Sequence, residues 1–108
     1  MKRVNQYEIV IVNLDPTIGR EIKKTRPCII VSPNEINRNL NIVTIVPITS
    51  QSKSYPTRVE IELSGNKNWA VIEQIRTIDK RRIHKIIGKL RNTEIKRIKE
   101  KIKETYVD

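Results

Sequence analysis

Residues 19–32 have the sequence GREIKKTRPCIIVS, which begins as a polar segment with a glycine and ends as an apolar, β-branched run. This change of composition predicts a loop that leads into a buried strand. Glu21, Lys24 and Arg26 come just before that strand, where a rigid sheet can orient them. Together a carboxylate and two cations can bind and polarise a phosphate, although a surface ion pair on the loop is the simpler interpretation.

Length and composition limit the number of domains, the fold class and the class of partner. With 108 residues, the chain is expected to form a single domain over residues 1–108. Its apolar residues are mostly Ile and Val, and it has no Phe and one Trp, which favours a mainly β fold. The formal net charge of +10 attracts polyanions, so nucleic acid is the partner class that the charge favours over simple solubility.

The apolar pattern predicts strands and a terminal helix. The strands are expected at Tyr7–Leu14, Pro27–Val31, Ile42–Ile48, Arg58–Leu63, Trp69–Ile75 and Ile86–Leu90, with turns at Ser64–Asn68 and Thr77–Arg82. A short helix is expected to begin at Ser32–Glu35 with Pro33 in its first turn. A last helix is expected after Thr93 as its cap, with three isoleucines on the face that packs on the sheet, Ile95, Ile98 and Ile102. The pattern indicates a small antiparallel β-barrel or strongly bent sheet with one terminal helix.

Two polar loops that leave strand ends carry reactive side chains, Gly19–Arg26 and Thr49–Pro56. RNA supplies its own nucleophile, the 2′-OH, so a protein need only position it, move protons and stabilise the crowded phosphorane. An arginine fits the last task because two N–H donors match two phosphate oxygens, and a threonine hydroxyl adds a further hydrogen bond. Glu21 either accepts the 2′-OH proton or orients Arg26, and the sequence leaves both roles open.

Other chemistries find little support in the sequence. The single histidine, His84, excludes a paired-histidine nuclease within one subunit, and Cys28 sits in an apolar run as a core residue. No acidic cluster has Mg²⁺ spacing and no glycine-rich phosphate loop is present, so no metal or cofactor is expected. Tyr55 is a better base-stacking candidate than Trp69, which lies in a predicted strand.

The chain start lacks the apolar core of a signal peptide, and the sequence has no apolar run of membrane-spanning length. A cytoplasmic protein that does not enter a membrane is therefore expected.

Three motifs together resemble the MazF/PemK toxins. They are Gly19-x-Glu21-x-x-Lys24-x-Arg26-Pro27-x-x-Ile30-Val31-Ser32, then Val46-Pro47-Ile48-Thr49-Ser50, then Glu73-Gln74-Ile75-Arg76-Thr77-Ile78-Asp79-Lys80-x-Arg82-Ile83. The resemblance implies an SH3-like antiparallel β-barrel with short helices and a C-terminal helix, acting as a homodimer. It also implies a sequence-specific, metal-independent endoribonuclease of a toxin–antitoxin pair, which cuts single-stranded mRNA to leave a 2′,3′-cyclic phosphate and a 5′-OH. An acidic antitoxin is the implied protein partner, and the charge of +10 suits it as it suits RNA.

The resemblance also assigns roles to residues. Arg26 and Thr49 match the catalytic arginine and threonine of the family, and Glu21 matches an acidic residue implicated in activity in some members. Positions expected to contact RNA are Lys24, Ser50, Gln51, Lys53, Tyr55, Glu73 and Gln74. Glu73 stands where some members carry an active-site aspartate. Val71 replaces an arginine that is catalytic in certain relatives, which favours the Arg26 and Thr49 arrangement.

Two other functions stay open at this point. Gyrase-inhibiting toxins on the same fold depend on a C-terminal Trp-Gly-Ile, whereas this chain ends Glu104-Thr105-Tyr106-Val107-Asp108. A basic nucleic-acid-binding module without catalysis is the second alternative. It predicts that loss of Arg26 weakens binding slightly, as the loss of any phosphate contact would.

Overall fold

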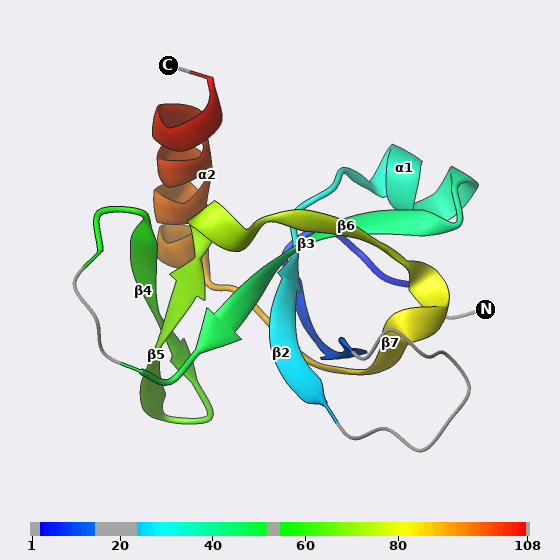
Figure 1. Cartoon of the computed structure of the whole chain (residues 1–108), viewed down its shortest axis with the longest axis horizontal. Helices are drawn as coiled ribbons and strands as arrows, with labels where there is room; N and C mark the ends of the chain where they lie inside the picture. Colours follow the sequence, from blue (N-terminus) through cyan, green and yellow to red (C-terminus); the bar gives the residue numbers. More distant parts are fainter. Residues whose placement is uncertain (1–2, 15–23, 52–54, 108) are drawn as a thin grey trace.

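A computed structural model describes residues 3–14, 24–51 and 55–107 of the chain. Seven strands form a curled antiparallel sheet, with a long helix at the C-terminal end (Figure 1). The strands are β1 (Glu8–Asn13), β2 (Thr25–Ile30), β3 (Ile42–Thr49), β4 (Arg58–Leu63), β5 (Asn66–Val71), β6 (Arg76–Asp79) and β7 (Ile83–Lys89). The helices are α1 (Asn34–Asn39) and α2 (Asn92–Tyr106), with the 3₁₀ turns η1 (Ile72–Gln74) and η2 (Lys80–Arg82). The predicted bent sheet with a terminal helix is confirmed.

Strand β3 is the centre of the sheet. Strand order is β4-β5-β3-β2-β1-β7, and β6 also pairs with β3. On one side β3 pairs with β2 through Cys28 opposite Pro47. On its other side the first half of β3 pairs with β6, and its end pairs with β5 through Thr49 opposite Trp69. Beyond Pro47 the end of β3 therefore leaves β2 and continues along β5.

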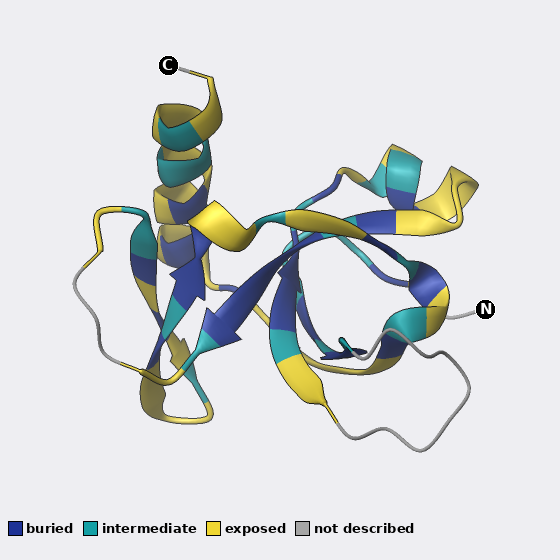
Figure 2. Cartoon of the chain, in the orientation of Figure 1, coloured by how far each residue is buried: buried dark blue, intermediate teal, exposed yellow. Residues whose placement is uncertain are grey.

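The two faces of the curled sheet are buried in two different cores, which explains the nearly continuous apolar runs of β1, β2 and β3. The core inside the curl contains Val10, Val12, Cys28, Ile30, Val43, Ile45, Ile78 and Ile83. The other core lies under α2 and contains Ile9, Ile29, Val46, Ile48, Val59, Ile61, Ala70, Ile72 and Ile98. Figure 2 shows the buried residues concentrated in these strands. Alternate residues of one strand thus enter opposite cores.

Helix α2 covers one face of β4 and β5 with its isoleucine stripe. Ile98 is fully buried in the core under α2, and Ile95 and Ile102 pack against it, as the sequence pattern predicts. Near the C-terminal end of the helix, the Tyr106 hydroxyl donates to the carbonyl oxygen of Ile72 at 2.8 Å. The helix therefore fixes η1 as well as the sheet.

Three sequence predictions about strands and turns need correction. Residues Thr77–Arg82 were predicted as a turn, but Arg76–Asp79 form β6, because pairing with β3 satisfies their backbone groups. The predicted strand Trp69–Ile75 ends at Val71 and gives way to η1, whereas β5 begins earlier, at Asn66. Ser64 and Gly65 both have positive φ, so a two-residue hairpin turn suffices where five residues were expected.

The starts of the two helices and of the last strand also differ from their predicted positions. Helix α1 has Pro33 as its N-cap rather than in its first turn, and α2 has Arg91 as its N-cap rather than Thr93. In place of a threonine hydroxyl, the Glu94 carboxylate accepts from the Arg91 backbone N–H at 2.9 Å. Strand β7 begins at Ile83, three residues before its predicted start, because it continues the ladder on β1.

No helix within the described residues is long and apolar enough to cross a membrane.

Candidate active site

Arg26 and Thr49 lie on the same face of the sheet at the open end of the core inside the curl. The last residue pair between β2 and β3 is Cys28 opposite Pro47, and each candidate is two residues beyond that pair. Residues two apart on a strand share a face, and paired residues of antiparallel strands point to the same side. The register thus puts the arginine and the threonine that the sequence singled out on one face of the sheet, although they are 23 positions apart in the chain.

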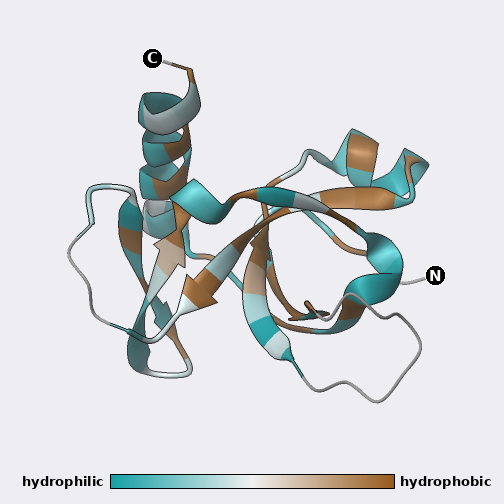
Figure 3. Ribbon diagram, in the orientation of Figure 1, coloured by the Kyte–Doolittle hydropathy of each residue, from teal (hydrophilic) through white to brown (hydrophobic). Residues whose placement is uncertain are grey.

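The strand end that carries Arg26 is exposed and polar. Thr25 and Arg26 are exposed whereas Cys28, Ile29 and Ile30 are buried, so β2 passes from solvent into the core within three residues (Figure 2). The same end of β2 is hydrophilic in Figure 3, and the rest of the strand is not. Among the described residues, the Arg26 guanidinium has no ion-pair partner. It is therefore available to an anionic ligand.

A second arginine shares this face. Arg76 of β6 pairs with Ile45, which places it on the side of β3 that also bears Pro47 and the inner core. Burial raises the pKa of the Cys28 thiol to about 12, and the charges of Arg26 and Arg76 oppose that rise. Both guanidinium groups are thus near the same sulfur, and they set up a local positive field. The thiol itself stays neutral and is a core group, as predicted.

The Thr49 hydroxyl donates to none of the described residues. Its oxygen accepts from the Gln51 backbone N–H at 3.2 Å, which stabilises the bend where the chain leaves β3. A hydroxyl has one hydrogen and two acceptor sites, so this contact leaves the hydrogen available to a phosphate oxygen. Thr49 is partly exposed, as that role requires.

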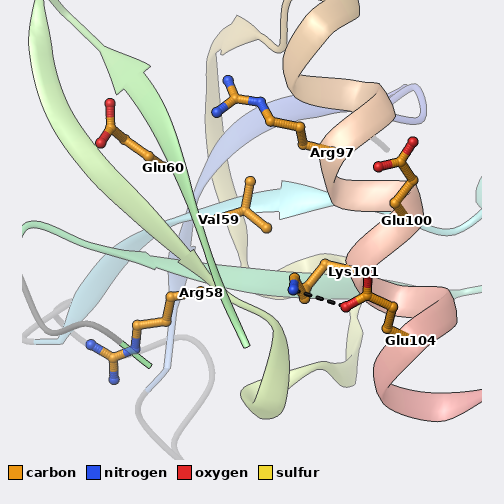
Figure 4. A pocket seen from close by; sticks show the side chains of 7 residues that line it. All are labelled: Arg58, Val59, Glu60, Arg97, Glu100, Lys101 and Glu104. Atoms are coloured by element: carbon orange, nitrogen blue, oxygen red, sulfur yellow. Dashed lines mark hydrogen bonds and ion pairs between the residues drawn. The ribbon is translucent and has the colours of Figure 1, made fainter. Parts of the chain in front are cut away.

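The same face continues across β5 and β4. Thr49 pairs with Trp69, Trp69 with Glu60, and Val71 with Arg58, so all five residues lie on the side opposite α2. Figure 4 shows the side chains of Arg58 and Glu60 extending away from α2, whereas Val59 points toward the helix. Trp69 is half-buried beside Thr49 rather than in either core.

Tyr55, Arg58 and Glu73 form a cluster on this side of β4. The Arg58 guanidinium carbon lies 4.8 Å from the centroid of the Tyr55 ring, and Arg58 Nη2 lies 3.6 Å from Glu73 Oε2. Thr57 donates from its hydroxyl to Glu73 Oε1 at 2.7 Å. Burial alone would raise the pKa of Glu73, but the Thr57 hydrogen bond and the Arg58 charge together hold it below its ordinary value. The carboxylate is therefore ionised at neutral pH.

The remaining predicted site residues are only partly placed. Lys24, Ser50 and Gln51 are exposed in the segments that flank Arg26 and Thr49, and Gln74 is exposed at the end of η1. Glu21 and Lys53 lie outside the described residues, and their predicted roles stay predictions.

Three residues of this face were not among the predicted site residues. Arg76 was quoted only within a motif, Trp69 was ranked below Tyr55 as a stacking candidate, and Arg58 was named only as the start of a predicted strand. The strand alternation of β4 and β5 places Arg58 and Trp69 on one face. The pairing of β6 with β3, which the predicted turn concealed, was needed to place Arg76.

A groove of about 250 Å³ lies between β4 and α2, and it shares Arg58 and Glu60 with the candidate face (Figure 4). Three cations and three carboxylates line it with Val59, namely Arg58, Arg97, Lys101, Glu60, Glu100 and Glu104. Lys101 and Glu104 pair at 2.9 Å, so part of this charge is already compensated. A polyanion gains little from such a mixed surface. In the part of the chain that the structure describes, no three His, Cys, Asp or Glu residues could jointly hold a metal ion.

Residues 5–106 match the family described as PemK-like, MazF-like toxin of type II toxin–antitoxin system. Endoribonuclease MazF9 of Mycobacterium tuberculosis is 32% identical over 106 residues, which cover 89% of this chain and 90% of that protein. Endoribonuclease toxin MazF of Escherichia coli K12 is 32% identical over 71 residues, which cover 66% of this chain and 64% of that protein.

A solved structure agrees on the fold. An endoribonuclease from a mycobacterial species, in complex with its cognate antitoxin, superposes with a TM-score of 0.80 at 20% identity. The match covers 94% of this chain and 92% of that chain. At this identity the likeness concerns the fold, whereas the family match and MazF9 extend over most of the sequence. The chain belongs to the family of PemK-like, MazF-like toxins of type II toxin–antitoxin systems.

Proposed function

We propose that this protein is a sequence-specific, metal-independent endoribonuclease toxin that acts on single-stranded mRNA in the cytoplasm. The observation that supports the proposal is that strand register puts Arg26 and Thr49 on one exposed face of the sheet, a face that Arg76 shares. The endoribonuclease activity that MazF9 and E. coli MazF carry in their names agrees with it.

The proposed reaction uses the RNA as its own nucleophile. The 2′ oxygen attacks the adjacent phosphorus, the P–O5′ bond breaks, and the products are a 2′,3′-cyclic phosphate and a 5′-OH. A base takes the 2′ proton, and the leaving 5′ oxygen gains one. Arg26 stabilises the charge that grows on the phosphorane oxygens, and the Thr49 hydroxyl donates to one of them. Glu21 is the proposed proton acceptor or orienting group.

The test is to incubate the purified protein with a long RNA of mixed sequence in excess EDTA and to map new 5′-OH ends. We expect discrete cuts at a recurring short sequence, and cyclic phosphate on the upstream fragments. Uncut RNA that the folded protein still binds would contradict the enzyme and favour a binding module. If the folded protein neither cuts nor binds RNA, a protein target such as gyrase becomes the better candidate.

Thr49 gives a further prediction, about its hydroxyl. Thr49→Val keeps the shape of the side chain and removes the donor, so we expect turnover to fall about 10-fold, the worth of one good hydrogen bond. Thr49→Ser retains the hydroxyl and should stay close to the wild-type rate. Both rates are to be measured per folded molecule, with folding checked by circular dichroism. A Thr49→Val protein that is less stable but cuts at the full rate would contradict a catalytic role for Thr49. The hydroxyl would then have only the structural role of accepting from Gln51.

We also propose two protein partners, an acidic antitoxin and a second copy of the chain. The charge of +10 favours an acidic partner, and the solved mycobacterial relative is bound to its antitoxin. Strand β7 is the last strand in the sheet order, and its Ile86 and Ile87 are about 40% exposed, which is typical of a surface that binds another chain. Sedimentation equilibrium at micromolar concentration tests the homodimer.

A further inference from the structure

The cluster of Tyr55, Arg58 and Glu73 is built as one rigid unit. The Arg58 backbone N–H donates to the Tyr55 carbonyl at 3.1 Å, which closes a turn with Pro56 at its second position. The Thr57 carbonyl accepts from the Ile72 backbone N–H at 3.1 Å, so this turn is fastened to η1. Because Tyr106 of α2 binds the carbonyl of the same Ile72, the turn, η1 and α2 hold one another in place.

Arg58 is the residue that connects the two exposed members of the cluster. Its side chain is only 12% exposed, whereas the Glu73 side chain is 36% exposed and Tyr55 is 51% exposed. The guanidinium lies over one face of the Tyr55 ring and reaches the Glu73 carboxylate with Nη2. Its Nε is buried and finds no acceptor among the described residues.

The exposed parts of the cluster match the chemistry of a nucleobase. Arg58 lies over the Tyr55 ring, and the 51% exposure of Tyr55 leaves ring surface on which a base can stack. Such stacking tolerates any base. An ionised carboxylate only accepts hydrogen bonds and offers about four acceptor sites. Thr57 occupies one site of Glu73 and Arg58 lies near another, which leaves sites for an N–H donor of the base. Amino groups of adenine, cytosine and guanine donate, whereas uracil presents carbonyl oxygens on both sides of its single N–H.

We propose that Arg58 is a positioning residue that holds Tyr55 and Glu73 as a base-reading site selective for a base with an exocyclic amine over uracil. This inference rests on the proposed function, because it concerns how the face that carries Thr49 recognises the bases of its RNA substrate. Arg58 acts through its neighbours and does not itself touch the reacting phosphate.

The first experiment deletes single amino groups from the substrate. Once the preferred cleavage sequence is mapped on random RNA, each base of that sequence is replaced in a short oligonucleotide by its analogue without the amine. The analogues are purine riboside for adenosine, inosine for guanosine and 2-pyrimidinone riboside for cytidine. At one position we expect kcat/KM of the wild type to fall about 10-fold or more, in line with the discrimination of a good base contact. No such position, with the enzyme otherwise active, would overturn the inference.

The second experiment asks whether Arg58 is responsible. Arg58→Met keeps the length of the side chain and removes the charge, so the discrimination should shrink to less than about 3-fold, and uracil should be tolerated at that position. Turnover on the best substrate should change far less. Arg97→Met is the matched control, because Arg97 belongs to α2 and its Nε donates to the Thr93 carbonyl of the same helix at 3.4 Å. Its cleavage pattern should equal that of the wild type. If Arg58→Met fails to fold, Arg58→Lys replaces it, and it should discriminate less than the wild type because it lacks the planar fork. An unchanged pattern in the folded variant would overturn the inference.

A failure of the proposed function gives a different result. If the wild-type protein does not cut RNA at all, the inference is tested by binding of fluorescent oligo(A), oligo(C) and oligo(U) of equal length. The wild type should bind oligo(U) about 10-fold more weakly than the better of the other two, and Arg58→Met should lose this difference. Equal binding of all three by the wild type would overturn the inference independently of catalysis.

Discussion

Replacing Arg26 with alanine should lower the rate of RNA cleavage by roughly 100-fold or more, while affinity for uncleaved RNA falls only slightly. The reason is that the charge on the phosphorane oxygens is larger and more localised in the transition state than in the bound substrate. Arg26 is exposed at the end of β2, and none of the described residues neutralises it, so its loss should leave the fold intact. Single-turnover rates and filter binding of a non-cleavable 2′-deoxy substrate measure the two quantities separately.

Lys99→Ala is the control for this experiment. Lys99 is exposed on α2, whose packing face lies against the sheet on the side opposite Thr49, so this variant removes one positive charge without touching the candidate site. Its cleavage rate should stay within about 2-fold of the wild type, which is the size expected for a small change in long-range attraction. If Arg26→Ala and Lys99→Ala lose equal amounts of binding and cleavage, Arg26 is an ordinary phosphate contact and the binding module becomes the better description.

Local patterns were sufficient to predict most of the fold. The alternation of β4 and the isoleucine stripe of α2 both describe one buried and one exposed face, which is information carried by neighbouring residues alone. The element that was missed is β6. Its residues Arg76 and Thr77 are exposed, and strand formation there depends on pairing with β3, more than 30 positions earlier in the chain. Tertiary pairing overrides a weak local preference in such a segment.

The residues of the candidate site were also only partly predictable from local sequence. Arg26 and Thr49 were selected because their residue types suit phosphate chemistry and because the family resemblance matched them, and the register then put them on one face of the sheet. Arg58 was not selected, because an arginine in an alternating strand is usually a solvated side chain. Its role in the cluster depends on Tyr55 and Glu73, which come from a turn and from η1. No local sequence pattern predicts that these three residues come into contact.

Glu94 is a buried carboxylate that joins α2 to the edge strand β4. It is only 1% exposed, and it accepts from the Glu62 backbone N–H at 2.8 Å and from Arg91 Nη2 at 3.2 Å, in addition to its bond with the Arg91 backbone. Burial alone would raise the pKa of Glu94, but these hydrogen bonds and the Arg91 charge together hold it below its ordinary value. The folded state therefore favours the ionised form.

The direction of that pKa shift fixes how stability depends on pH. A carboxyl group with a lowered folded-state pKa adds stability that is fully present above the unfolded-state pKa, about 4.3 for glutamate, and that is lost as pH falls through the folded-state value. Glu94→Gln introduces an amide donor facing groups that are themselves donors. We expect it to lower the free energy of unfolding by about 2 kcal/mol at pH 7.

Urea unfolding of the wild type and Glu94→Gln at pH 7 and at pH 3 measures this effect. At pH 3 protonation converts part of the wild-type population to a form with the same mismatch, so the difference between the two proteins should shrink. Glu100→Gln, at an exposed position of α2, should stay within about 0.5 kcal/mol of the wild type at both pH values. A Glu94→Gln deficit that is equal at both pH values would mean that the shape of this side chain, and not its charge, ties α2 to β4.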